Sequence, residues 1–176
     1  MANRDALRAF QSRLAGRLQA AKSSGVSAAW LAVEAGMSKY LFPLGHAGEI
    51  FPWTAPQPVP YTEPWFLGVA NLRGGLYGVV ELASFASGDA AAPAPESARH
   101  GARLVALNEL LEVNCALLID RLVGLRGTEA FTASTEPAHD APAWMGHAYT
   151  DAAGATWQEI NLQALSQQPQ FLSIGA

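Results

Sequence analysis

The sequence is poor in cysteine, in long apolar runs and in signals for export. Its single cysteine, Cys115, excludes an intrachain disulfide, and its apolar neighbours favour a small buried core residue over a reactive thiol. No run approaches the roughly 18 uninterrupted apolar residues of a membrane-spanning helix, and the N-terminus lacks the apolar block and cleavage site of a signal peptide. We therefore expect a soluble, cytoplasmic protein that is not inserted in a membrane.

Catalytic and metal-binding motifs are also scarce. The four histidines (His46, His100, His139 and His147) do not have the spacing of a metal-ligand set, and Gly-x-Ser-x-Gly and phosphate-binding loops are absent. The His139-Asp140 pair lies beside prolines, which favours a turn over a general base with its orienting carboxylate. We expect no enzyme, cofactor or metal, and a small β-barrel hydrolase that uses His139 or His147 stays as an alternative.

Basic residues are few outside the N-terminal segment. Residues 1–22 hold five basic residues and one acidic residue, whereas the remainder holds six basic and 14 acidic residues, a net charge of −8. Such a body repels nucleic acid, which binds clustered Lys and Arg, so we expect no nucleic-acid partner. Half of all residues are hydrophobic and 15% are charged, which predicts a folded chain with a core.

The N-terminal segment has the pattern of an amphipathic helix. Leu7, Phe10, Leu14 and Leu18 recur at helical spacing within residues 3–22, with the arginines mostly on other faces. Asn3 can cap this helix and Gly25 can end it. A basic amphipathic helix of this kind binds a membrane surface or a partner groove, or it packs on its own domain.

The stretch from Trp65 to Leu82 predicts a β-hairpin. Two short runs rich in Val, Leu, Phe and Tyr meet at Asn71-Leu72-Arg73-Gly74-Gly75, where the glycine pair can supply the positive φ of a tight turn. This pattern places Arg73 at the hairpin tip. A charged residue there is either a solvated turn residue or a contact for a partner.

Similar short runs occupy most of the remaining chain. Residues 30–36 and 38–45 predict a hairpin that turns at Gly36-Met37, and residues 102–107 and 111–119 predict two further strands. Five prolines between residues 52 and 64 predict an extended connection, and residues 86–99 have the composition of a flexible linker.

The two halves of the chain repeat this order. Trp65 and Trp144 each open a hairpin, and Gly74 matches Gly154 at an offset of 79 to 80 residues, which indicates a duplicated β unit. Two packed barrels protect strand edges best. We expect a helix in residues 1–25 and one domain in residues 26–176, with a first barrel at about 28–86, a linker at about 87–101 and a second barrel at about 102–165.

One motif resembles a known family. Gly68-Val-Ala-Asn-Leu-Arg-Gly74, which follows Gly48-Glu49-Ile50 and a proline-rich connection and precedes Val79-Val-Glu-Leu82, is similar to the CheW family of chemotaxis coupling proteins. The resemblance runs from about Trp30 to Leu165. Within the family, the basic N-terminal segment and the Gly-Val-Ala-Asn sequence look most like PilI-type adaptors of the chemosensory system that governs type IV pilus twitching motility.

The resemblance implies an all-β fold with two pseudo-duplicated, five-stranded SH3-like barrels around a shared hydrophobic core. It also implies a non-enzymatic signal-transduction adaptor that holds the cytoplasmic tip of a methyl-accepting chemoreceptor beside the regulatory domain of a CheA-type histidine kinase. A CheW-like regulatory scaffold outside a receptor array is the alternative within the same fold.

The resemblance further implies a set of partner-binding positions. Arg73 and Glu49 match the receptor-contacting arginine and its partner glutamate, and the neighbouring positions of that surface or of the kinase contact are Ala47, Ile50, Gly68, Asn71 and Gly74. An exposed pair between Arg73 and Glu49 adds only about 0 to 1 kcal/mol to folding. We therefore expect it to fix the direction of the guanidinium and the choice of partner.

Overall fold

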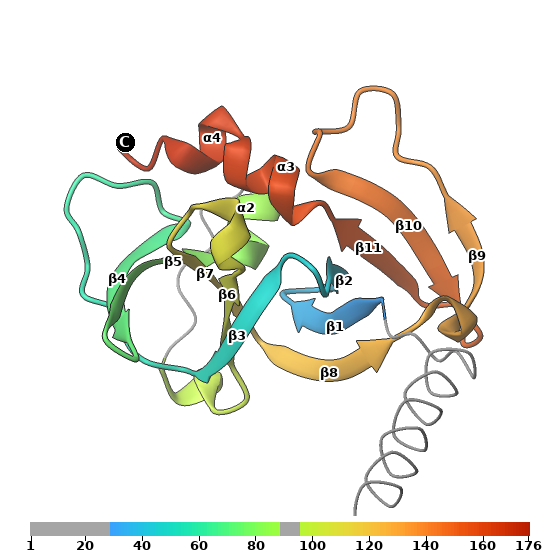
Figure 1. Cartoon of the computed structure of the whole chain (residues 1–176), viewed down its shortest axis with the longest axis horizontal. Coiled ribbons are helices and arrows are strands. Elements are labelled where there is room, and N and C mark those ends of the chain that lie inside the picture. Colours follow the sequence, from blue (N-terminus) through green and yellow to red (C-terminus); the bar gives the residue numbers. More distant parts are fainter. Residues whose placement is uncertain (1–28, 89–95) are drawn as a thin grey trace, which may run out of the picture.

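Strands dominate the part of the chain that the structure describes. The computed structural model describes residues 29–88 and 96–176, so the helix predicted for residues 3–22, with its cap at Asn3 and its end at Gly25, lies outside the described residues. Within these ranges the chain forms one six-stranded and one five-stranded sheet, which confirms the all-β fold class (Figure 1). No helix in the same ranges has the length and hydropathy to cross a bilayer.

The six-stranded sheet has the spatial order β8-β1-β2-β11-β10-β9. Its strands are β1 (Trp30–Ala35), β2 (Ser38–Pro43), β8 (Arg121–Arg126), β9 (Phe131–Thr135), β10 (Met145–Asp151) and β11 (Thr156–Ile160). Neighbours are antiparallel except β2 and β11, which run parallel.

The five-stranded sheet has the order β3-β6-β7-β5-β4. Its strands are β3 (Ala47–Pro52), β4 (Phe66–Leu72), β5 (Gly75–Glu81), β6 (Arg103–Leu107) and β7 (Cys115–Ile119). Here β5 and β7 are the parallel pair, and the other neighbours are antiparallel.

Short helices connect the strands. They are α2 (Leu82–Ser87), α3 (Leu162–Gln167) and α4 (Pro169–Leu172), with 3₁₀ helices η1 (Glu96–Arg99), η2 (Glu109–Leu111) and η3 (Thr128–Ala130). Figure 1 shows α2, α3 and α4 along the same side of the molecule. One expectation needs correction here: the strand predicted from residue 111 begins only at Cys115, because η2 and Glu112 at φ 56° precede it. The linker at about 87–101 stays a prediction, because residues 89–95 lie outside the described residues.

The hairpin turns follow the sequence prediction closely. The β1–β2 turn falls at Gly36-Met37, and the β4–β5 turn joins Leu72 to Gly75. Of the glycine pair 74–75, however, only Gly74 has a positive φ (81°), and the second positive φ of the turn lies at Arg73 (50°). Because Leu72 pairs with Gly75, the two central residues of the turn are Arg73 and Gly74, and a two-residue hairpin turn of this kind needs positive φ at both.

The predicted duplication is visible in the topology. The order β8-β1-β2-β11-β10 repeats β3-β6-β7-β5-β4 in strand direction, and β9 adds a sixth strand. Equivalent hydrogen bonds close the two Trp-led hairpins. The Glu81 amide donates to the Trp65 carbonyl at 2.8 Å, and the Asn161 amide donates to the Trp144 carbonyl at 2.7 Å. Each hairpin then leads directly into a short helix, α2 or α3.

The two repeats exchange their first hairpins. The β1–β2 hairpin enters the sheet formed by β8 to β11, and the β6–β7 hairpin enters the sheet formed by β3 to β5. Strands from residues 28–86 and from residues 102–165 therefore occur in both sheets. The division into a first and a second barrel at those boundaries stays a prediction, whereas the sheets themselves are built from both segments.

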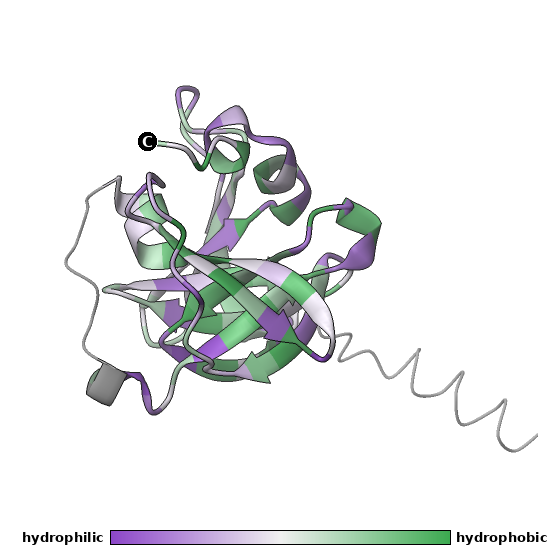
Figure 2. Ribbon diagram, turned by 90° about the vertical axis from the view of Figure 1, so that its left-hand side faces the viewer, coloured by the Kyte–Doolittle hydropathy of each residue, from purple (hydrophilic) through white to green (hydrophobic). Residues whose placement is uncertain are grey.

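Three clusters of buried side chains hold the sheets together. The largest lies between the sheets and includes Val33, Phe42, Leu117 and Ile119, while the other two include Phe51, Leu104 and Leu118 on the five-stranded sheet and Trp30, Leu41 and Trp157 on the six-stranded sheet. Strand β7 lies at the centre of the five-stranded sheet and is buried on both faces, so all five of its residues are apolar. Figure 2 shows these hydrophobic segments on the strands that cross the middle of the molecule.

Candidate partner-binding site

The β4–β5 turn presents Arg73 to solvent. The Asn71 carboxamide oxygen accepts a hydrogen bond from the Gly74 amide at 2.9 Å, which fixes the turn from within. Arg73 takes the left-handed conformation at φ 50°, and its side chain is 76% exposed. The predicted position of this arginine at the hairpin tip is therefore correct.

Arg73 forms an ion pair with Glu49. The Nη1 atom of Arg73 contacts Oε1 of Glu49, which is 43% exposed and lies on β3. Since β3 and β4 are the two edge strands of the five-stranded sheet, this pair connects the opposite edges of one sheet. The sheet must curve strongly for its edges to approach so closely, and the pair sits where they meet.

Two aromatic residues that the sequence analysis did not single out support this arginine. The guanidinium carbon of Arg73 lies 5.9 Å from the ring centroid of Phe51, and the Phe51 ring lies 6.2 Å from that of Tyr77. Phe51 is buried and follows Glu49 by two residues, so the two side chains project from the same face of β3. That spacing is the signal by which the sequence alone points to Phe51.

A bulge in β3 separates the predicted site residues into two groups. The register with β6 shifts between Ala47 and Ile50, so both of these side chains pack against the core between the sheets, while Phe51 faces the core of the five-stranded sheet. Gly48 lies in the bulge, where a Cβ would stand 2.9 Å from the carbonyl oxygens of Ala106 and Leu107. The structure thus brings Glu49 to Arg73 and turns Ala47 and Ile50 toward the interior.

Gly68 lies away from the ion pair, within β4. Its φ is 134°, and a Cβ there would stand 2.1 Å from the Gln57 carbonyl oxygen. The extended connection before β4 pairs at this point with the strand, through two hydrogen bonds between Gln57 and Val69. The proline-rich segment is extended at Gln57, where Gly68 allows it to approach the sheet edge, whereas Tyr61 takes a left-handed φ of 60° further along the same segment.

A shallow hollow of about 270 Å³ adjoins the ion pair. Its lining residues come from β3, β5, β6 and the start of η2, and they are Gly48, Glu49, Tyr77, Ala106, Leu107, Asn108 and Glu109. Two exposed leucines neighbour lining residues in sequence: Leu76, before Tyr77, is 62% exposed, and Leu110, after Glu109, is 80% exposed. Arginine is enriched at protein-recognition surfaces, and exposed apolar side chains add contact area to them.

The remaining candidates for chemistry do not converge. Cys115 is buried, and burial raises the pKa of its thiol to about 12, which agrees with the predicted core role. His139 lies in the exposed connection between β9 and β10, and His147 lies on β10 against Tyr149. Among residues 29–88 and 96–176, no group of three or more His, Cys, Asp or Glu side chains is placed to hold a metal ion.

Comparison with known proteins identifies related sequences and folds. A model of the CheW-like domain matches residues 29–170. The fold is similar to the crystal structure of the scaffolding protein TtCheW from Thermoanaerobacter tengcongensis, with a TM-score of 0.57 and 13% sequence identity, and the alignment covers 75% of this chain and 87% of that chain. No curated protein matches the sequence.

Proposed function

Because the chain belongs to the CheW-like domain family of coupling and scaffold proteins in chemotaxis-type signalling, we propose that it is a non-enzymatic adaptor. In this proposal it couples the cytoplasmic tip of a methyl-accepting chemoreceptor to the regulatory domain of a CheA-type histidine kinase. The observation that carries the proposal is the Arg73–Glu49 pair, which presents an oriented guanidinium at an exposed turn.

The geometry of the pair supports a recognition role. Glu49 holds one side of the guanidinium and the Phe51 ring lies beneath it, so the side chain loses less conformational freedom when a partner binds. Leu76 and Leu110, which neighbour lining residues of the hollow in sequence, are exposed and offer apolar contact area to a partner. Arginine and buried apolar contacts carry most of the energy at typical interfaces, and charge sets partner choice.

The remaining site residues have supporting roles in this proposal. Asn71 and Gly74 hold the turn conformation, Gly48 lets β3 lie close to the β6 carbonyls beside Glu49, and Ala47, Ile50 and Gly68 fix the strands that carry the pair. We assign the output to type IV pilus twitching motility. This assignment rests on the basic segment at residues 1–22 and on the Gly-Val-Ala-Asn sequence before Leu72.

The test is a pull-down from the native cell, with mass spectrometry of the retained proteins. The variant is Arg73→Glu, and the matched control is Arg126→Glu on β8, whose guanidinium, among the residues that the structure describes, donates a hydrogen bond to a backbone carbonyl. We expect the wild type and the control to retain a CheA-type kinase and a chemoreceptor, and Arg73→Glu to lose the receptor. The double variant Arg73→Glu with Glu49→Arg should not restore binding, because the charge that faces the partner stays reversed.

Other outcomes would replace the proposal. Retention of a kinase without any receptor, by the wild type, would favour a regulatory scaffold outside a receptor array. Retention of neither would remove the coupling function. Twitching assays of the same variants in the native cell test the output separately, since an Arg73→Glu strain that twitches normally would contradict only the pilus assignment.

A further inference from the structure

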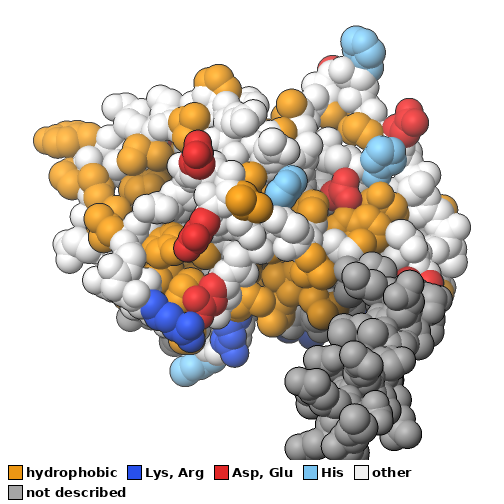
Figure 3. Space-filling view, viewed as in Figure 1, with side chains coloured by type: hydrophobic (Ala, Val, Ile, Leu, Met, Phe, Trp, Pro, Cys, Tyr) orange, Lys and Arg blue, Asp and Glu red, His pale blue; other side chains and the backbone are white. Residues whose placement is uncertain are grey.

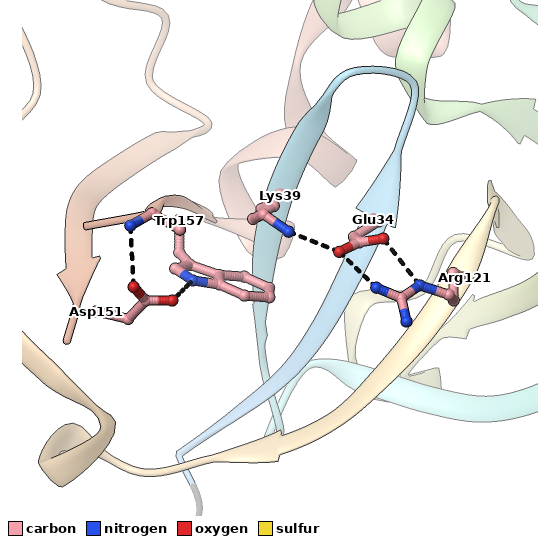
Figure 4. A network of polar contacts seen from close by, with 6 residues as sticks. Glu34, Lys39, Arg121, Asp151 and Trp157 are labelled. Atoms are coloured by element: carbon pink, nitrogen blue, oxygen red, sulfur yellow. Dashed lines mark hydrogen bonds and ion pairs between the residues drawn. The ribbon is translucent and has the colours of Figure 1, made fainter. Parts of the chain in front are cut away.

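Met37 is the most exposed large apolar residue among those the structure describes. It occupies the tip of the β1–β2 hairpin with a relative exposure of 103%. This end of the hairpin is firmly held. The Gly36 amide donates to the Asp120 carboxylate at 2.6 Å, and Glu34 accepts two hydrogen bonds from Arg121 and one from Lys39 (Figure 4). The exposure of Met37 is thus built into an ordered turn.

Two hollows adjoin Met37, and we call them together the Met37 groove. One, of about 510 Å³, lies between the turn, α2 and β10, and the other, of about 390 Å³, lies toward the β10–β11 turn. The apolar side chains that line the groove are Ala35, Met37, Tyr40, Ala83, Ala86, Met145 and Ala155. Both hollows include Met37, Ser38 and Gln158, and the one charged residue among those that line them is Lys39, in the second hollow. The first hollow is lined mostly by apolar side chains around Met37, and a surface of this kind can seat the apolar stripe of a helix.

The chain itself carries a stripe of this kind outside the described residues. Leu7, Phe10, Leu14 and Leu18 recur at helical spacing, and the segment 1–22 carries a net charge of +4. The remainder of the chain carries −8, and Figure 3 shows acidic side chains scattered over the visible face while Lys and Arg gather near its lower edge. The opposite net charges of residues 1–22 and of the remaining chain therefore attract each other.

The connection is long enough to reach. The described chain starts at Ala29, beside the first residue of β1, and Met37 lies beyond the other end of that strand. Six strand residues span about 20 Å, and the seven residues from Lys22, at the end of the docking segment, to Ala29 extend to about 23 Å, which is enough to bring that end to Met37. A tether of this length holds the segment near the groove at an effective concentration on the order of millimolar, so weak contacts suffice.

We propose that residues 3–22 dock as a helix in the Met37 groove of their own chain and cover Met37. The apolar stripe then lies against Met37, Met145 and the alanines of α2, and the arginines face solvent. Any protein that binds this end of the six-stranded sheet must displace the segment first. The proposal does not depend on the coupling function or on the Arg73 site.

Methionine methyl spectroscopy of the full-length chain tests this docking directly. The sequence has three methionines, and two of them, Met37 and Met145, line the groove. A spin label on Ser12→Cys reports proximity, because the native Cys115 is buried and does not react. We expect loss of the Met37 and Met145 methyl signals, while the amide of Asn71 at the far hairpin tip stays unaffected.

Matched variants and mixing separate the possible occupants. Phe10→Asp with Leu14→Asp, in the spin-labelled chain, should restore both methyl signals. Ala9→Asp with Gly16→Asp makes the same change of charge on the opposite face of the helix and should not restore them. A mixture of isotope-labelled chains and separate spin-labelled chains should show no loss. Loss in that mixture would assign the groove to a second copy, and intact signals in the spin-labelled chain would show that residues 3–22 do not dock there. Either result overturns the proposal.

Discussion

Arg73 on the β4–β5 turn and Glu49 on β3 form an ion pair that joins the two edges of the five-stranded sheet. The same two residues carry the proposed recognition of a partner. Their contact therefore has two possible effects, on the closure of the sheet and on binding, and these are separable by experiment. Because both side chains are exposed, we expect the pair to contribute little to the stability of the closed sheet and to act mainly in binding.

The first prediction concerns the stability of the fold without this pair. Because Arg73 is 76% exposed, Arg73→Ala, Glu49→Ala and the double variant should yield a coupling free energy of about 0 to 1 kcal/mol. Urea denaturation of the four proteins measures it. A coupling of several kcal/mol would mean that the pair is needed to close the sheet, and the loss of binding by Arg73→Glu would then no longer report recognition.

The second prediction concerns Phe51, the buried ring beneath Arg73. Phe51→Leu removes the ring from the guanidinium and from Tyr77 and leaves part of the core of the five-stranded sheet unfilled. We expect a loss of about 1 to 2 kcal/mol in the free energy of unfolding, larger than the loss for Arg73→Ala. Tyr77→Phe keeps the ring and is the control, with little expected change. Equal stability of Phe51→Leu and Arg73→Ala would contradict the packing role of Phe51.

The third prediction concerns Gly68 and separates fold from partner contact. Gly68→Ala places a Cβ 2.1 Å from the Gln57 carbonyl oxygen at a φ of 134°, so the proline-rich connection has to move off β4. We expect a loss of about 3 kcal/mol or more. Gly154→Ala is the control, because it also has positive φ but no atom within 4 Å, and it should cost about 1 kcal/mol. Thermal unfolding compares the two variants, and similar melting temperatures would refute the close approach.

These residues also show how far the sequence alone predicts this molecule. Both turns, the buried Cys115 and the duplicated order of strands follow from local patterns, because glycine placement and alternating apolar residues act over a few positions. The exchange of hairpins between sheets does not, since the parallel pairs β2–β11 and β5–β7 join segments distant in sequence. The bulge in β3 is also not predictable from the sequence pattern. The resemblance to the CheW family therefore grouped Ala47 and Ile50 with Glu49, although their side chains face the interior.

The last prediction follows from Glu34, which Arg121 and Lys39 flank with hydrogen bonds of 2.7 to 2.9 Å (Figure 4). The bonds from Arg121 and then Lys39 lower the pKa of this carboxyl from 4.5 to about 2. A lowered folded-state pKa means that the ionised form stabilises the fold above the unfolded pKa, and that this stability disappears as pH falls from about 5 to about 2. Since Arg121 is 64% exposed, solvent screening limits the contribution to about 1 to 2 kcal/mol.

Urea denaturation of wild type and Glu34→Gln should therefore show a difference in unfolding free energy at pH 7 that narrows as pH falls from about 5 to about 2. The control Glu136→Gln, at an exposed site, should show no such difference from wild type. A gap of constant size down to pH 2 would mean that Glu34 acts through packing and not through its charge.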